Sequence, residues 1–169
     1  MLDFMVIALP RSGSAWLANW LTTDTSICLH DPLATSTLEE LDAMDGGRTF
    51  GIADTSLFLY PTDRIERHPA RKLVLARDFN AANQSLARLG LPRMDHGIKT
   101  KILRLPYRFA LYGDLFDQTK AKPIYEYLLQ KPFDPIRHRA LCDWNVQNTA
   151  SIELTRKALH EQSSSAWHD

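Results

Sequence analysis

Residues 4–16 read FMVIALPRSGSAW, and this stretch decides the fold. Phe4 to Leu9 form a continuous apolar run that Pro10 ends, which is typical of a strand buried on both faces of a parallel sheet. Tryptophan and leucine then recur at helical spacing between residues 16 and 21. We therefore expect a buried strand, a loop rich in serine and glycine, and an amphipathic helix in direct succession.

The same alternation continues beyond this unit. Further strands are predicted at Ser26–Leu29, Phe50–Ala53, Leu57–Tyr60 and Lys72–Ala76. Helices are predicted at about Ser36–Met44, after Asp78 as far as Gly90, and at Ile124–Leu129, Ile136–Trp144 and Ile152–Leu159. Strands that alternate with helices favour an α/β fold with a parallel sheet flanked by helices, here with a mostly helical C-terminal half.

Composition narrows the class of protein. The chain has 169 residues, of which 44% are apolar and 24% are charged, so it is long and apolar enough to bury the core of one domain. We predict that this domain spans 1–162 and that 163–169 form a flexible tail. Twenty basic and 20 acidic side chains give a net charge of zero, so no overall field attracts nucleic acid or a membrane surface.

The two cysteines and the N-terminus suggest a location. Cys28 and Cys142 are too few for a disulfide framework and lack the paired spacing of a zinc site, so we expect buried thiols, no metal and a reducing compartment. Asp3 before the first apolar run and Arg11 after it do not fit a signal peptide. A cytoplasmic protein is predicted.

The loop after the first strand has the residues of an anion site. Backbone N–H groups at the start of a helix point toward a bound anion, Gly13 permits close approach, and Arg11 adds a permanent charge. A Walker A loop would have glycine, lysine and a hydroxyl where Ala8, Ser14 and Ala15 stand, so ATP with magnesium is disfavoured. The alternative is a surface turn followed by a core helix.

The sequence Pro-Arg-Ser-Gly-Ser-x-Trp at 10–16 resembles the 5′-phosphosulfate-binding loop of sulfotransferases, as in a short bacterial or phage-type member. This resemblance implies a three-layer P-loop NTPase-like sheet flanked by helices. It also implies that the sulfuryl donor is 3′-phosphoadenosine-5′-phosphosulfate (PAPS), which becomes 3′-phosphoadenosine 5′-phosphate (PAP) after transfer. The cofactor would then be bound by Arg11, Ser12, Gly13, Ser14, Ala15 and Trp16.

Two further segments extend the resemblance. In the family, an arginine that ends a strand and a serine eight residues later bind the 3′-phosphate, and Arg77 and Ser85 have this spacing. Residues 112–115, Tyr-Gly-Asp-Leu, and 132–134, Pro-Phe-Asp, are similar to a pattern of bacterial sulfotransferases. The chain is shorter than most members and lacks their Arg-Lys-Gly loop, to which 156–158, Arg-Lys-Ala, is a faint parallel.

Sulfuryl transfer needs a base that accepts the proton of the attacking group, besides positive charge at the migrating group. Arg11 is the candidate for charge stabilisation. Some bacterial members use a glutamate before a proline, and His30-Asp31-Pro32 stands in that place here. Asp31 with His30 is therefore our first candidate for the base, and Asp54 is the second. Each acidic residue can equally be an ordinary turn or capping residue.

These observations leave two classes of function. The leading hypothesis is a sulfotransferase that acts on a hydroxyl or amine of a small-molecule or glycan acceptor. The other is a non-catalytic module that binds a nucleotide or, through its C-terminal helices, a protein. A divergent nucleotide kinase is disfavoured because the Walker lysine is missing. No motif indicates the acceptor or the oligomeric state.

Overall fold

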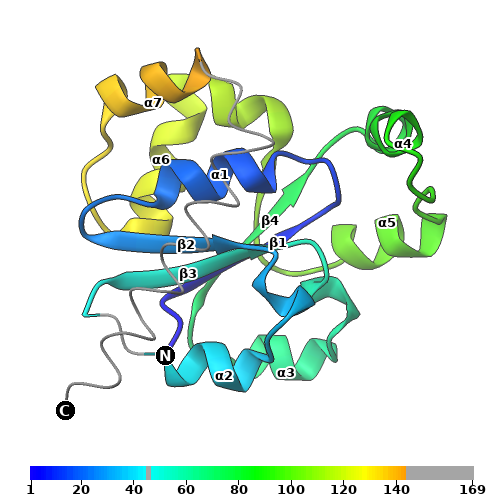
Figure 1. The fold of residues 1–169 in the computed structure, drawn as a ribbon, viewed down its shortest axis with the longest axis horizontal. Helices are drawn as coiled ribbons and strands as arrows, with labels where there is room; N and C mark the ends of the chain where they lie inside the picture. Colours follow the sequence, from blue (N-terminus) through cyan, green and yellow to red (C-terminus); the bar gives the residue numbers. More distant parts are fainter. Residues whose placement is uncertain (45–46, 144–169) are drawn as a thin grey trace.

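The computed structural model describes residues 1–44 and 47–143 and has an α/β fold built on a five-stranded parallel sheet (Figure 1). The strand order is β2-β3-β1-β4-β5, and all four neighbouring pairs are parallel. The strands are β1 (Phe4–Ala8), β2 (Ser26–His30), β3 (Thr49–Asp54), β4 (Arg71–Ala76) and β5 (Arg108–Leu111).

Helices cover both faces of this sheet. In Figure 1, α1, α6 and α7 lie above it, and α2 and α3 lie below it. The helices are α1 (Ser14–Leu21), α2 (Leu38–Ala43), α3 (Thr62–Arg67), α4 (Phe79–Arg88), α5 (His96–Leu103), α6 (Gln118–Leu129) and α7 (Pro135–Cys142). In the described residues, three short 3₁₀ turns each lie between a strand and the next helix: η1 (Pro32–Ala34), η2 (Leu57–Leu59) and η3 (Tyr112–Phe116).

β1 is the centre of the core, as its apolar sequence predicts. All five of its residues are buried, and they alternate between two hydrophobic clusters on opposite faces of the sheet. Phe4 and Val6 pack with Trp16 and Trp20 of α1, whereas Met5 lies in the cluster between the sheet and the helices α2 and α3. A strand enclosed in this way has no polar face, which explains why its sequence does not alternate.

Side-chain caps define the starts of several helices. The Thr37 hydroxyl accepts from the Glu40 amide while the Glu40 carboxylate accepts from the Thr37 amide, a capping box at the start of α2. The Asp78 carboxylate caps α4, as the sequence predicts, by accepting from the Ala81 amide at 2.8 Å.

One predicted strand is absent from the structure, and one strand of the structure was not predicted. The prediction of a strand at Leu57–Tyr60 is wrong, because Leu57–Leu59 form the turn η2, whose Leu57 and Phe58 side chains are buried in the core. The fifth strand is instead β5, which pairs with β4 at the edge of the sheet and exposes three of its four residues. α6 and α7 lie where helices are predicted, while the predicted helix at 152–159 and the tail at 163–169 lie outside the described residues.

The strand order predicts where on the sheet a ligand-binding crevice lies. After β1 the chain turns toward β3 and β2, whereas after β4 it turns toward β5. At such a reversal, the loops that follow the two neighbouring strands diverge and leave a crevice at their carboxyl ends. The loop at 9–13 lies at this position. Within the described residues, no helix is both long and apolar enough to cross a lipid bilayer.

Candidate functional site

The β1–α1 loop is a tight turn with two residues in the left-handed region. Arg11 has φ 63° and Gly13 has φ 90°. A Cβ atom on Gly13 would lie 2.9 Å from Cδ2 of Tyr112, so position 13 requires glycine for both its conformation and its close approach. Ser12 holds the turn from inside, because its amide and its hydroxyl both donate to the Leu9 carbonyl, at 3.1 and 2.5 Å.

The start of α1 has free backbone donors. The first intrahelical bond runs from the Leu17 amide to the Gly13 carbonyl at 2.9 Å, and Gly13 offers no side-chain cap. The amides of residues 14–16 therefore have no acceptor within the helix, and the positive end of the helix dipole lies beside them. The Trp16 side chain points elsewhere, since it is buried and its Nε1 donates to the Leu141 carbonyl at 2.9 Å.

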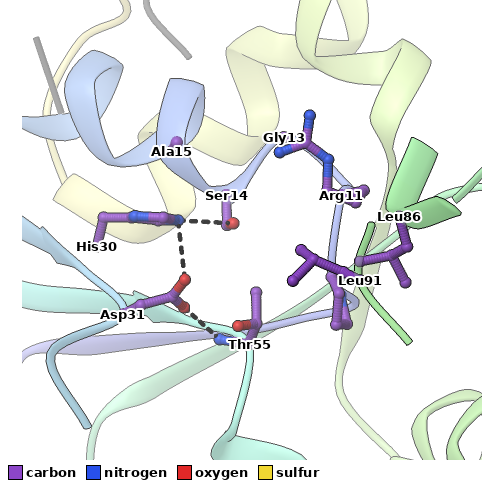
Figure 2. Close-up of a pocket in the computed structure, with 10 residues that line it drawn as sticks. Arg11, Gly13, Ser14, Ala15, His30, Asp31, Thr55, Leu86 and Leu91 are labelled. Atoms are coloured by element: carbon purple, nitrogen blue, oxygen red, sulfur yellow. Dashed lines mark hydrogen bonds and ion pairs between the residues drawn. The ribbon is translucent and has the colours of Figure 1, made fainter. Parts of the chain in front are cut away.

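A pocket of about 240 Å³ opens in front of this loop (Figure 2). Arg11, Ser14, His30, Asp31 and Thr55 contribute polar groups around the same space that Leu86 and Leu91 border on one side in Figure 2. The pocket is lined by Pro10, Arg11, Gly13, Ser14, Ala15, His30, Asp31, Thr55, Leu86 and Leu91.

His30 and Asp31, at the end of β2, face the loop from across the pocket. His30 Nε2 lies 3.1 Å from Ser14 Oγ and 3.2 Å from Asp31 Oδ2. The other carboxylate oxygen of Asp31, Oδ1, accepts from the Thr55 amide at 2.7 Å. The two side chains are 24% and 34% exposed, so both reach solvent through the pocket. An acid and an imidazole are thus held beside the predicted anion site.

Arg77 and Ser85 both contact Arg11, although neither lines the pocket. Arg11 Nε donates to Ser85 Oγ at 3.0 Å, and Arg77 Nη1 donates to the Arg11 carbonyl at 3.1 Å. The Arg77 guanidinium also stacks on the Tyr112 ring, 4.4 Å from its centroid. The sequence predicts that the end of β4 and the helix α4 lie close together, and in the structure a residue of each contacts Arg11 of the loop.

Asp54 lies apart from this group. Its side chain is buried and does not line the pocket. Oδ2 accepts from the Leu33 amide at 2.9 Å, and Oδ1 accepts from both the amide and the hydroxyl of Ser56, at 2.7 and 2.6 Å. With three donors on its two oxygens, this carboxylate connects the loops after β2 and β3.

Of the predicted site residues, the structure brings Arg11, Gly13, Ser14, Ala15, His30 and Asp31 around the pocket. Ser12, Trp16 and Asp54 have side chains in the interior, as described above. Thr55 was not among the predicted site residues, although its place directly after β3, at the carboxyl edge of the sheet, could have indicated it. The sequence gives no indication that Leu91 lines the pocket, because a leucine in a loop is not distinguishable from an ordinary surface residue.

The arrangement suits binding of an anion together with transfer of a proton. The guanidinium and the free amides attract negative charge, and Asp31 and His30 can exchange a proton with a neighbouring hydroxyl or amine. In residues 1–44 and 47–143, no three His, Cys, Asp or Glu side chains gather as a metal site. Comparison with protein-family models, with curated proteins and with solved structures found no match to this chain.

Proposed function

We propose that this protein is a sulfotransferase-like enzyme that transfers a sulfuryl group from PAPS to a hydroxyl or amine of a small molecule or glycan. The observation that carries the proposal is the meeting of Arg77 and Ser85 on Arg11. These residues are the ones that the resemblance assigns to the 3′-phosphate and the 5′-phosphosulfate. Their contact across separate elements supports a common site for both ends of the nucleotide.

The residues of the loop fit an anionic group. Gly13 allows the tight turn against the Tyr112 ring, the amides of residues 14–16 lack helical acceptors, and Arg11 supplies a guanidinium. When bound, PAPS supplies an activated sulfuryl group. Arg11 and the amides would hold this group in line with the acceptor and stabilise negative charge at the bridging oxygen.

Asp31 is the better candidate for the base. It lines the pocket, its Oδ1 accepts from the Thr55 amide, and its Oδ2 has the His30 imidazole, at 3.2 Å, as its only partner among the described residues. Oδ2 would accept the proton of a hydroxyl or amine that enters the pocket beside His30. Asp54 is buried and both of its oxygens already accept hydrogen bonds. We therefore assign the proton transfer to Asp31, with His30 beside it, and not to Asp54.

Calorimetric titration with PAP, with adenosine 5′-monophosphate (AMP) and with ATP plus magnesium tests the proposal. We expect PAP to bind more tightly than the other two nucleotides. Arg11→Ala should weaken binding of both PAP and AMP and abolish transfer, whereas Arg77→Ala should reduce the preference for PAP. Arg88→Ala is the matched control, because this exposed arginine of α4 has no ion-pair partner among the described residues.

The possible outcomes separate the two classes of function. Equal affinities for PAP and AMP in the wild-type protein would contradict the cofactor assignment. PAP binding without transfer from PAPS to any of a panel of alcohols, phenols, amines and glycans would favour the non-catalytic module. Asp31→Asn should retain PAP binding and lose transfer, because the amide cannot accept the proton.

A further inference from the structure

The pocket in front of the loop has little net positive charge when His30 is neutral. Its lining contains one guanidinium, Arg11, and one carboxylate, Asp31, whose charges oppose each other. A phosphate or sulfate dianion that enters would therefore meet a nearby carboxylate with only one lining cation to balance it. A further positive charge in the lining would strengthen binding considerably, because the site is partly shielded from water.

His30 is placed to provide that charge. Its Nε2 atom faces Ser14 Oγ at 3.1 Å and Asp31 Oδ2 at 3.2 Å, which fits an Nε2–H that donates toward both oxygens. Nδ1 has no hydrogen-bond partner among the described residues. A neutral ring in this tautomer can therefore bind a second proton at Nδ1 without losing any contact.

One carboxylate and one guanidinium share the pocket with His30. Asp31 is the only carboxylate among the described residues within ion-pair distance of the imidazole. Asp54 ends the neighbouring strand β3, but Leu33 and Ser56 already donate to its oxygens. Arg11 is the cation that shares the pocket with His30. An anion bound at the loop would offset the repulsion from Arg11 and leave the ring beside two negative groups.

We propose that binding of a phosphate or sulfate group at the loop takes up one proton from solvent, which His30 holds at Nδ1. The imidazolium keeps Nε2–H toward Asp31 and Ser14 and so becomes the second cation of the pocket. Ser14 occupies the sequence position of the lysine in a Walker loop. A protonated His30, at the end of β2, would place a positive charge beside it. The inference rests on the proposed anion site and adds a proton to its binding step.

Linkage makes this proposal measurable. If binding takes up a proton, affinity must fall as pH rises through the range in which the free imidazole loses its charge. Inorganic sulfate is the probe, because it remains a dianion throughout this range and any pH dependence belongs to the protein. We expect the affinity for sulfate to fall by up to about tenfold per pH unit in that range.

Calorimetry in two buffers of different ionisation enthalpy counts the protons directly. We expect uptake of a substantial fraction of one proton per sulfate by the wild-type protein at neutral pH. His30→Gln should abolish both the uptake and the pH dependence, and Asp31→Asn should reduce them. His96→Gln is the control, because this exposed histidine of α5 packs on Phe79 and does not line the pocket.

The wild-type measurement keeps the test valid even if a variant folds poorly. Sulfate binding without proton uptake, uptake that persists in a folded His30→Gln variant, or no sulfate binding at all would each overturn the inference. Proton-linked sulfate binding without a preference for PAP over AMP would support the inference and contradict the proposed function. A preference for PAP without proton uptake would do the reverse.

Discussion

Arg11 Nε donates a hydrogen bond of 3.0 Å to Ser85 Oγ, although 74 positions of sequence separate the two residues. Arg11 belongs to the β1–α1 loop, and Ser85 lies in the second turn of α4. The serine therefore orients the guanidinium that the loop would present to an anion. It can affect binding in two ways, through Arg11 and through its own hydroxyl proton.

Ser85→Ala should lower the affinity for AMP as well as for PAP. Loss of one hydrogen bond to a charged group corresponds to about 1.5 kcal/mol, or about a tenfold weaker binding of the 5′-phosphate. Calorimetric titration of both nucleotides measures this effect. Gln84→Ala, at the exposed neighbouring position, should leave both affinities unchanged. A loss confined to PAP would mean that Ser85 contacts only the 3′-phosphate and does not act through Arg11.

Gly51→Ala should destabilise the fold without involving the site. Gly51 lies in β3 opposite Phe4 of β1, and an added Cβ would overlap the Phe4 ring, which is itself fully buried. Overpacking of this kind costs about 1–3 kcal/mol. Urea denaturation measures the change, with Gly113→Ala as control because a Cβ at position 113 meets nothing within 4 Å. Equal stability of the two variants would contradict the packing of Phe4 on Gly51.

Arg137→Ala should destabilise the contact between α7 and α1. Arg137 donates to three carbonyls at the end of α1, those of Asn19 at 2.9 Å, Trp20 at 3.4 Å and Thr22 at 2.5 Å. A cation at this position satisfies orphan carbonyls and the negative end of the helix dipole. We expect a loss of about 2 kcal/mol in the free energy of unfolding.

Arg139→Ala is the matched control for that variant. It removes an exposed arginine of the same helix, and this arginine forms no ion pair among the described residues. The change in the free energy of unfolding should stay within about 0.5 kcal/mol. Thermal and urea unfolding of the two variants measure the difference. If Arg139→Ala proved as destabilising as Arg137→Ala, helix propensity or net charge, and not the three carbonyl contacts, would explain the loss.

Acid should remove a contribution that Asp117 makes to stability. The hydroxyl and amide of Thr119 donate to the Asp117 carboxylate at 2.7 and 2.9 Å, and these bonds hold its pKa below the ordinary value of 3.8. Because the folded state binds this proton less readily than the unfolded state, the stabilisation is complete above the ordinary pKa. It is lost as pH falls through the lowered pKa.

Asp117→Asn should therefore lower the denaturation midpoint at neutral pH, while the two proteins should converge once the pH is low enough to protonate the Asp117 carboxyl in the folded state. The amide keeps the capping geometry and removes only the charge. Asp24→Asn, at an exposed position, controls for the general effect of one fewer carboxylate. A difference that is the same at neutral and acidic pH would show that the charge at position 117 does not stabilise the start of α6.

Local patterns explain how much of the fold could be predicted. β1 and β4 have apolar runs long enough to be recognised, and Asp78 caps α4 through a contact three residues away. The prediction failed at Leu57–Tyr60, where four apolar residues resemble a strand. A short apolar run does not distinguish a strand from a buried turn. Leu57 and Phe58 reach the core from η2 instead.

β5 could not be predicted for the complementary reason. It is an edge strand with one neighbour, and although Phe109, Ala110 and Leu111 are apolar, only Ala110 is buried. The run is short and does not alternate apolar with polar residues, so it does not mark a strand. Its conformation depends on backbone hydrogen bonds to β4 and not on its own side chains. Trp16 shows the same limit at the site, because its motif position suggested a cofactor contact while its side chain packs in the core.

The sequence by itself determined the buried strand β1, the turn that Gly13 permits, and the helix that follows, because each depends on neighbours a few residues apart. The tertiary structure alone decided what surrounds that turn. The order β2-β3-β1-β4-β5 brings His30, Asp31 and Thr55 to one side of the loop and Ser85 to the other. Strand order follows from pairing and packing between distant segments, which no local pattern of residues encodes.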